Sequence, residues 1–289
     1  MLPEMNSETS HIHKSEKKRA AVIGNPIKHS HSPLIHNHFL KKLNISASYE
    51  AIHIESVAEL HQFLNDIRSM KWAGINVTIP YKEHVISLLD QVDNMVETIG
   101  ACNTIVNKNG KLYGFNTDAA GFAYPLDPSN IEQVMVLGNG GSAKAVLYQC
   151  AVLNINKMIL VARDHTKTEA YIKKLNLLFG VSIELRSFNA INQSDIENTS
   201  MIVNTTSIGL SHEDKPFDFI DMISEKQIFY DLIYNPWETE MMKISRNNGA
   251  TVINGAAMLA HQGALAFEKF FNQLPNTNEM INLLENEKK

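Results

Sequence analysis

The sequence predicts an α/β fold of two domains built on parallel-rich sheets. Its 289 residues suit about two domains, and a hydrophobic fraction of 44% is enough to fill two cores. Short apolar runs alternate with segments of helical periodicity in both halves, which is typical of parallel strands joined by right-handed helical crossovers. A stretch with two prolines in six residues, 124–129, separates the halves and is the predicted linker.

The first half begins with a short buried strand, AVIG, that breaks at a Gly-Asn-Pro turn. The loop 27–32 then leads to Pro33, which suits the start of a helix. Later in this half, an Asn-Gly turn between two short strands predicts a hairpin. The predicted elements are strand 20–23, helix 33–43, strand 49–54, helix 57–68, strand 74–79 and the hairpin strands 103–106 and 111–114.

The segment GINVTIPYK, residues 74–82, combines a strand end with a lysine. On a strand, Asn76 and Thr78 face one side and their apolar neighbours face the other. Pro80 ends the strand, and the helical spacing that follows places Lys82 in the first turn of a helix. The partial positive charge of that helix end favours the neutral amine, so it predicts a pKa below about 10.4. The pattern indicates a hydroxylated substrate and a proton transfer, with a solvated lysine as the alternative.

The second half contains a complete βαβ unit. An apolar strand, a glycine loop and a helix follow one another directly, and another apolar strand comes next. The predicted elements are strand 133–137, loop 138–142, helix 143–153, strands 157–162, 200–204, 227–232 and 250–253, and a long helix 256–271. We expect these strands to form a second parallel sheet.

The loop between the first strand and helix of this unit matches the pattern G-x-G-x-x-G/A over Gly138–Ala143. Such glycines permit a tight turn and close backbone approach, and the helix N-terminus then receives a pyrophosphate. The loop therefore predicts dinucleotide binding, and a glycine turn in an unrelated α/β domain is the alternative. The next strand ends in Arg163 and Asp164, with Lys167 a turn later. The two cations favour the 2′-phosphate of NADP, whereas the acid suits the 2′-hydroxyl of NAD.

Composition excludes several classes of protein. The net charge of −5 gives no support to nucleic-acid binding, and no apolar stretch is long enough to span a membrane. Residues 1–17 are polar, without the apolar stretch of a signal peptide, and are expected to be a flexible extension, so we expect a cytoplasmic protein. Cys102 and Cys150 lack metal or disulfide spacing and are expected in the core. The H-x-H spacing of His29 and His31 suggests a metal, but no carboxylate or cysteine joins it and none is predicted.

Five motifs in order make the chain resemble the shikimate dehydrogenase family from about residue 18 to the last helix. They read GNPIKHSHSPLIHN from Gly24, NVTIPYK from Asn76, GACNTIV from Gly100, GFNTDAAG from Gly114 and VNTTSIG from Val203. The glycine loop lies between the last two, and DLIYNPWET and GAAMLAHQGA follow them. The resemblance implies that Lys82 is the catalytic lysine and that Asp118 is its carboxylate partner. Because Asp118 opposes the effect of the helix end, the net pKa of Lys82 is left open.

The resemblance also implies the remaining site residues. It places substrate contacts at Ser30, Ser32, Asn76, Thr78, Asn103, Tyr234 and Gln262. It places cofactor contacts at Gly138, Asn139, Gly140, Gly141, Ser142, Ala143, Ala162, Arg163, Asp164, Lys167, Thr205, Thr206, Ser207, Leu232, Gly255 and Met258. It implies a substrate domain of residues 18–122 plus 255–289, a Rossmann domain of residues 123–254, and a site in the cleft between them.

This chain departs from the family pattern at a few positions. Alanine replaces the usual glycine at Ala119 and Ala257, and a methyl group at Ala257 is expected to crowd the nicotinamide. Ala162 replaces an asparagine, and Asp164 adds an acid where the family prefers none. These changes affect the expected cofactor preference more than the expected activity.

The leading functional hypothesis is NADP-dependent reduction of 3-dehydroshikimate to shikimate. One alternative is an NAD-dependent quinate/shikimate dehydrogenase, which Asp164 favours. Another is a non-catalytic sensor that binds the same ligand, which would be expected to lose Lys82 and Asp118. A monomer and a homodimer both fit the sequence.

Overall fold

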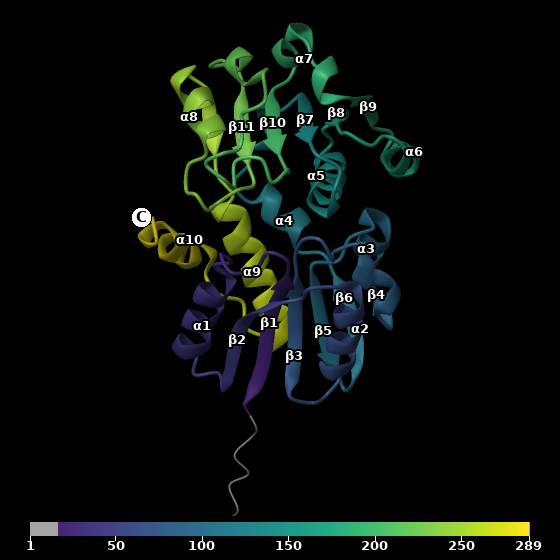
Figure 1. The fold of residues 1–289 in the computed structure, drawn as a ribbon, viewed down its shortest axis with the longest axis vertical. Coiled ribbons are helices and arrows are strands. Elements are labelled where there is room, and N and C mark those ends of the chain that lie inside the picture. The colour runs from purple at the N-terminus through teal and green to yellow at the C-terminus, as the bar shows by residue number, and fades with distance from the viewer. Residues whose placement is uncertain (1–16, 289) are drawn as a thin grey trace, which may run out of the picture.

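The computed structural model describes residues 17–288, except for the side chain of Lys167. The predicted N-terminal extension therefore lies outside the described residues apart from Lys17. Two six-stranded sheets stand one above the other, and helix α4 (Asp118–Ala123) lies between them (Figure 1). Across residues 17–288, no helix combines the length and the apolar character needed to span a membrane.

The first sheet has the strand order β2-β1-β3-β5-β6-β4. Its strands are β1 (Lys18–Gly24), β2 (Ala47–His53), β3 (Trp72–Val77), β4 (Gln91–Val92), β5 (Thr104–Lys108) and β6 (Lys111–Phe115). Strand β1 pairs in parallel with β2 and β3, as the alternation of strands and helices predicts. Strand β5 is antiparallel to both β3 and β6, so the predicted hairpin is confirmed and the sheet is mixed.

Helices cover both faces of this sheet. They are α1 (Ser32–Lys42), α2 (Val57–Asp66), α3 (Asn94–Ile99), α9 (Ala256–Phe271), α10 (Thr277–Asn286) and the 3-10 helix η1 (His84–Leu88). Helix α9 comes from the far end of the chain and buries Ala260 and Phe267 against Val22 of β1 and Phe39 of α1. The long C-terminal helix therefore belongs to the core of the first sheet, and the chain crosses between the sheets twice.

Strands of the second sheet are all parallel, in the order β12-β11-β10-β7-β8-β9. They are β7 (Gln133–Leu137), β8 (Lys157–Val161), β9 (Ser182–Arg186), β10 (Met201–Asn204), β11 (Ile228–Asp231) and β12 (Thr251–Ile253). The helices around it are α5 (Gly141–Val152), α6 (Thr166–Phe179), α7 (Gln193–Glu197) and α8 (Glu240–Asn247). Short 3-10 turns are η2 (Pro128–Asn130), η3 (Phe188–Ala190) and η4 (Ile220–Met222). From β7 the chain adds strands β8 and β9 on one side, and from β10 it adds β11 and β12 on the other, so the switch point lies between β7 and β10. Ligands of such sheets bind at the carboxyl ends of the strands that flank the switch point.

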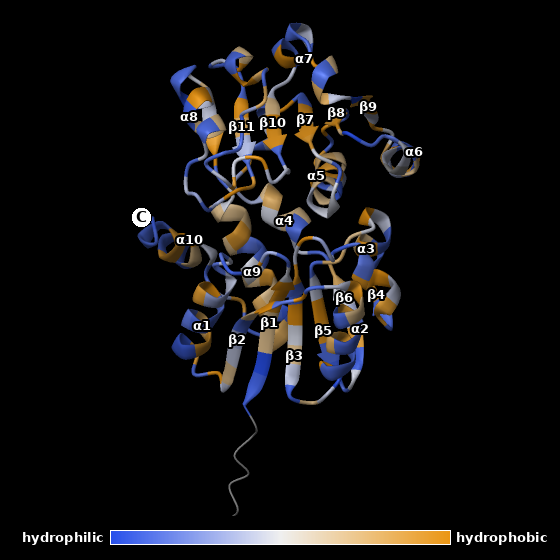
Figure 2. Cartoon of the chain, in the orientation of Figure 1, coloured by the Kyte–Doolittle hydropathy of each residue, from blue (hydrophilic) through white to orange (hydrophobic). Residues whose placement is uncertain are grey.

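Local sequence explains where several elements begin and end. The Ser56 side chain accepts a hydrogen bond from the Glu59 N–H at 3.2 Å and caps α2. Asp93 caps α3 in the same way through the Val96 N–H, and Gly100 ends that helix in the left-handed region at φ 70°. Hydrophobic residues dominate the central strands of both sheets (Figure 2), and both cysteines are fully buried, as expected.

One prediction about the fold is wrong. Lys82 was expected in the first turn of a helix, but the structure forms a five-residue 3-10 helix that begins at His84. Lys82 itself lies in the turn between β3 and that helix. The apolar residues that mimic a helical stripe, among them Val85, fill the core of the first sheet instead. The argument from the dipole of that helix therefore has no basis.

Candidate active site

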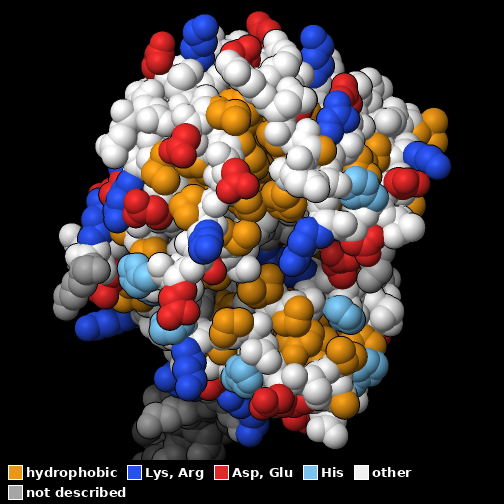
Figure 3. Space-filling view, turned by 45° about the horizontal axis from the view of Figure 1, so that its top comes forward, with side chains coloured by type: hydrophobic (Ala, Val, Ile, Leu, Met, Phe, Trp, Pro, Cys, Tyr) orange, Lys and Arg blue, Asp and Glu red, His pale blue; other side chains and the backbone are white. Residues whose placement is uncertain are grey.

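A cavity of about 540 Å³ opens between the first sheet and the loops at the carboxyl end of the second sheet. Its wall contains every residue predicted for substrate binding and proton transfer: Ser30, Ser32, Asn76, Thr78, Lys82, Asn103, Asp118, Tyr234 and Gln262. It also contains six predicted cofactor residues: Ser142, Thr205, Thr206, Leu232, Gly255 and Met258. Figure 3 shows basic side chains beside a hollow in the middle of the molecule. The structure therefore gathers residues from both halves of the chain around one space.

Lys82 and Asp118 form a close ion pair in the wall of this cavity. The Lys82 Nζ lies 2.7 Å from Asp118 Oδ2, and the two side chains are only 12% and 7% exposed. Lys82 Nζ also donates a hydrogen bond of 3.2 Å to Ser142 Oγ, in the first turn of α5. The helix end that faces the lysine is thus that of α5, from the other half of the chain. An ammonium at this helix end is unfavourable, and the Asp118 carboxylate offsets that cost.

Asn103 organises the groups around Asp118. Its Nδ2 donates to Asp118 Oδ1 at 2.8 Å and to Thr117 Oγ1 at 2.9 Å, while its Oδ1 accepts the Thr117 N–H at 2.8 Å. Gln262 reaches the same cluster from α9, with Oε1 3.3 Å from Asn103 Nδ2. The sequence predicted Asn103 and Gln262 as substrate contacts, and the structure adds that Asn103 holds the carboxylate. Thr117 was missed, although it directly precedes Asp118.

Asn76 is held on three sides at the end of β3. Its Oδ1 accepts a hydrogen bond from Tyr49 Oη at 2.7 Å, and its Nδ2 donates to Asn103 O and Thr104 Oγ1 at 3.2 and 3.0 Å. Thr78 lies just past the strand, because β3 ends at Val77 rather than before Pro80. Asn76 and Thr78 both line the cavity, as their spacing predicts. Thr104 lies in the motif GACNTIV but was assigned no role, and Tyr49 lies outside every quoted motif.

Another part of the cavity wall is formed by Ser30, Ser32 and Tyr234. The Ser32 N–H donates to Ser30 Oγ at 3.3 Å, and the Tyr234 side chain lines the same cavity. Burial raises the pKa of Tyr234 above its ordinary value, so the hydroxyl stays protonated near neutral pH and can donate a hydrogen bond. The three hydroxyls suit a polyhydroxylated or carboxylated ligand.

The glycine loop has the geometry that the sequence predicts for a nucleotide site. Gly138 adopts φ +103°, and a Cβ there would lie 2.8 Å from Thr205 Oγ1, so only glycine fits. Gly140 caps α5, and Gly141 is the first residue of that helix. The first N–H groups of a helix have no acceptor within it, so the N-terminus of α5 can receive an anion beside the cavity. Ala143 is buried in the first turn of the helix.

The other predicted cofactor residues lie at the same edge of the second sheet, outside the cavity wall. Asn139 Nδ2 donates to the Asp164 carbonyl at 3.0 Å, which ties the glycine loop to the end of β8. The Asp164 carboxylate accepts from the N–H and hydroxyl of Thr166, where it supports the start of α6. Arg163 is exposed on this edge, and Lys167 lies in α6 with its side chain outside the described atoms. Ala162 is buried after β8, and Ser207 is exposed after β10.

Asp231 joins the two loops of the second sheet that line the cavity. Its Oδ1 accepts from Asn204 Nδ2 at 3.0 Å and from the Ile233 N–H at 3.1 Å, and its Oδ2 accepts from Thr239 Oγ1 at 2.8 Å. Asn204 Oδ1 in turn accepts the Thr206 N–H at 3.0 Å. Burial raises the pKa of Asp231 to about 6, against the hydrogen bonds that lower it. Asp231 begins the motif DLIYNPWET, but the resemblance assigned it no role in the site.

We expect Asp231 to make the stability of the protein fall as pH rises from about 4 to about 6. In this window the unfolded chain releases the proton of Asp231 while the folded chain keeps it, so the free energy of unfolding decreases as pH increases. Two pKa units correspond to about 2–3 kcal/mol. Urea unfolding measures the free energy of unfolding of wild type and of Asp231→Asn at each pH. Between pH 4 and pH 7, the value for the variant should rise relative to that for wild type by about that amount. A difference that is constant with pH would contradict the expectation.

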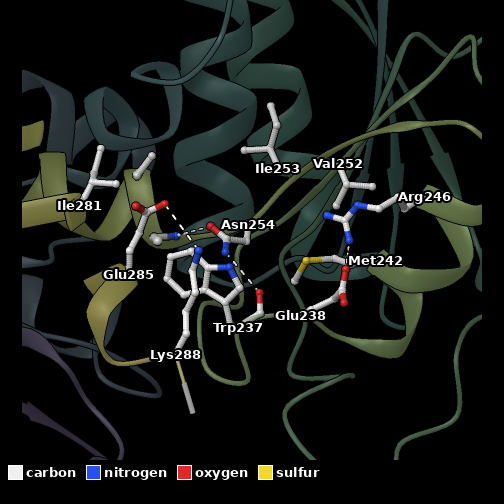
Figure 4. Close-up of a pocket in the computed structure, with 12 residues that line it drawn as sticks. Trp237, Glu238, Met242, Arg246, Val252, Ile253, Asn254, Ile281, Glu285 and Lys288 are labelled. Atoms are coloured by element: carbon white, nitrogen blue, oxygen red, sulfur yellow. Dashed lines mark hydrogen bonds and ion pairs between the residues drawn. The ribbon is translucent and has the colours of Figure 1, made fainter. Parts of the chain in front are cut away.

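A second cavity, of about 450 Å³, lies between α8, β12 and α10 (Figure 4). Its charged residues neutralise one another: Arg246 pairs with Glu238, and Lys288 lies 3.6 Å from Glu285. Ala257 lines this cavity and not the first one. The expectation that its methyl group crowds the nicotinamide is therefore not supported.

The histidines of the N-terminal motif are placed in different environments. His29 lines the first cavity, the ring centroid of His31 lies 5.5 Å from that of Tyr234 with the two planes tilted by 53°, and His38 lies 3.0 Å from Glu279 on α10. His36 is fully buried. Among residues 17–288, no group of three or more histidine, cysteine or acidic side chains is arranged to hold a metal ion.

Two α/β units that meet at a polar cavity, with a glycine loop at the switch point of one sheet, define a dinucleotide-dependent dehydrogenase. Family models described as the shikimate dehydrogenase substrate binding domain and the shikimate 5'-dehydrogenase C-terminal domain match residues 22–105 and 255–285. A curated shikimate dehydrogenase (NADP(+)) of Methanosphaera stadtmanae is 37% identical over 262 residues, covering 88% of this chain and 92% of the relative. The chain belongs to the shikimate dehydrogenase family.

Solved structures agree with this assignment. Shikimate 5-dehydrogenase of Thermus thermophilus, in complex with NADP(H) and shikimate, is 30% identical with a TM-score of 0.80, covering 93% of this chain and 99% of that one. Quinate dehydrogenase of Corynebacterium glutamicum, in complex with NAD, is 25% identical with a TM-score of 0.84, covering 94% and 100%. Both cofactors are thus represented among the structural relatives.

Proposed function

We propose that this protein catalyses the NADP-dependent, reversible reduction of 3-dehydroshikimate to shikimate, a step of aromatic amino acid and chorismate biosynthesis. The observation that carries the proposal is the buried pair of Lys82 and Asp118, 2.7 Å apart in a cavity that the glycine-loop helix also borders. The same pair argues against a non-catalytic sensor, which would have no need of it. The match to NADP-dependent relatives supports the choice of cofactor.

The residues predicted for substrate binding and proton transfer each have a role in this reaction. Lys82 donates a proton to the oxygen that becomes the hydroxyl, and bound NADPH supplies the hydride. Asp118 keeps the ammonium in place, and Asn103 holds Asp118. The hydroxyl and amide groups of the other predicted substrate residues bind the ligand's carboxylate and hydroxyls. Because both side chains of the pair are largely buried, water competes little for the proton.

The N-terminus of α5 would hold the pyrophosphate, with Gly138 and Gly140 allowing the close backbone approach. Arg163 is exposed at the edge of the sheet where an adenosine ribose would lie, and it suits a 2′-phosphate. Asp164 was expected to favour NAD, but its carboxylate accepts hydrogen bonds from the N–H and hydroxyl of Thr166 at the start of α6. NAD remains the second candidate, since the quinate dehydrogenase relative is in complex with it.

We further propose that residues 18–122 plus 255–289 form the substrate domain and residues 123–254 the dinucleotide domain. The packing of α9 in the core of the first sheet supports this division. We place the enzyme in the cytoplasm, as a monomer or a homodimer.

The function is tested by incubating the purified full chain with shikimate and either NADP or NAD, and following the absorbance of the reduced cofactor. We expect clear turnover that is faster with NADP. Comparable rates with both cofactors would contradict the NADP assignment, and turnover of quinate with NAD would favour the alternative enzyme. Shikimate binding without turnover would favour a sensor.

A further inference from the structure

Tyr49 places a buried hydroxyl directly behind Asn76, which lines the first cavity. It lies in β2, the edge strand of the first sheet, and is 3% exposed. Its Oη donates to Asn76 Oδ1 at 2.7 Å. Burial raises the pKa of Tyr49 well above its ordinary value, so the hydroxyl remains a donor. A predicted substrate residue thus accepts a hydrogen bond from a buried phenol that is not itself part of the cavity wall.

Two consecutive residues of α1 hold Tyr49 in place. The Asn37 side chain forms two hydrogen bonds with the Tyr49 backbone. Its Oδ1 accepts the Tyr49 N–H at 3.0 Å, and its Nδ2 donates to the Tyr49 carbonyl at 2.7 Å. His36 packs against its ring, with centroids 3.9 Å apart and planes 10° from parallel. The phenol is therefore fixed in position through both its backbone and its ring.

His36 contributes only its ring to this arrangement. It is fully buried, and neither ring nitrogen has a hydrogen-bond partner among the described atoms. Burial lowers its pKa to about 3, so the imidazole is neutral at physiological pH. An unsatisfied buried imidazole costs free energy. The ring contacts of this histidine are the stack on Tyr49 and the neighbouring rings of Phe267 and Phe270 of α9, at 5.8 and 6.3 Å.

We propose that Tyr49 is a positioning residue for substrate binding, and that His36 and Asn37 hold it in place. The Tyr49 hydroxyl takes one lone pair of Asn76 Oδ1, while Asn103 O and Thr104 Oγ1 take both N–H bonds of the amide. The amide is thereby locked, and the remaining lone pair of Oδ1 is left to accept a hydrogen bond from a substrate hydroxyl. This inference rests on the proposed function, because it assigns the cavity wall at Asn76 to the substrate.

The test is the Tyr49→Phe variant, which removes the hydroxyl and keeps the stacked ring. We expect the KM for shikimate to rise about five- to tenfold, with kcat within about twofold and the KM for NADP unchanged, because a single neutral hydrogen bond is lost. Tyr171→Phe is the matched control. Tyr171 is also buried and donates to a backbone carbonyl, that of Lys144 at 2.7 Å, but it does not line the cavity. This control should leave the KM for shikimate unchanged.

A double-mutant cycle with Asn76→Ala separates positioning from general stability. If Tyr49 acts through Asn76, Tyr49→Phe will have no further effect on the KM in the Asn76→Ala background. Asn37→Ser, which removes the backbone contacts, should raise the same KM while leaving the Tyr49 hydroxyl present. Additive effects in the cycle, or an unchanged KM in Tyr49→Phe, would overturn the inference while wild-type turnover upheld the function. A wild type that neither binds nor turns over shikimate would overturn both.

Discussion

Replacing Lys82 with alanine is expected to lower kcat for shikimate oxidation by two to four orders of magnitude, about the contribution of a positioned general acid or base. The ammonium is the only Lys or Arg group that shares the cavity wall with Asp118, among the described residues, and it is largely buried. No other described cation in that wall can take over the proton transfer. We expect little change in shikimate affinity, because the hydroxyl and amide groups of the wall remain.

The experiment compares steady-state kinetics with shikimate binding measured by calorimetry. Lys243→Ala is the matched control, since Lys243 is an exposed lysine on α8 that pairs with Glu240. This control should retain wild-type rates. A Lys82→Ala variant with unchanged turnover would refute the role of the lysine, and one that lost all shikimate binding would assign it to binding instead.

Gly255→Ala is expected to lower the free energy of unfolding by about 3 kcal/mol, at the upper end of the range for overpacking. A Cβ at this position would lie 2.0 Å from the Leu232 carbonyl oxygen and 2.6 Å from its carbon. Backbone atoms cannot rotate away as a side chain can, so either the loop after β11 or the start of α9 must move. Since Met258 and Gln262 of α9 line the cavity, turnover is expected to fall as well.

Urea unfolding followed by circular dichroism measures this effect. Gly140→Ala is the control for stability, because a Cβ there would meet no atom within 4 Å and its φ of −79° suits alanine. We expect this control to unfold at the wild-type urea concentration, even if its affinity for NADP falls. Equal unfolding midpoints for Gly255→Ala and wild type would contradict the steric argument.

Much of the fold was predictable because local patterns and tertiary packing agree. The apolar strand before Gly138 and the alternation around Asn76 each specify one buried face, so strand positions were right to within a few residues. The segment after Lys82 shows where local pattern fails. Its apolar spacing resembles a helix, but the core of the first sheet accepts those side chains from a short 3-10 turn.

Some residues of the candidate site could also be predicted from local sequence, and others could not. Lys82, Asp118 and the serines stand in motifs whose spacing could be read along the chain. Tyr49 could not be identified, because its contribution depends on Asn37 and Asn76, which lie on neighbouring elements. Asp231 is a similar case, since its raised pKa comes from burial between two loops and no neighbour in sequence predicts it.

The sequence by itself determined the family, the two α/β units and the glycine loop, and it predicted the pair Lys82 and Asp118, because these follow from residue types at fixed spacing. Only the tertiary structure decided which helix end faces Lys82. The expected helix after Lys82 is absent, and the N-terminus of α5 lies beside the ammonium instead, with Ser142 at 3.2 Å. The physical reason is that electrostatic and steric effects act through space. A contact between residues 82 and 142 exists only once the two sheets have packed around their shared cavity.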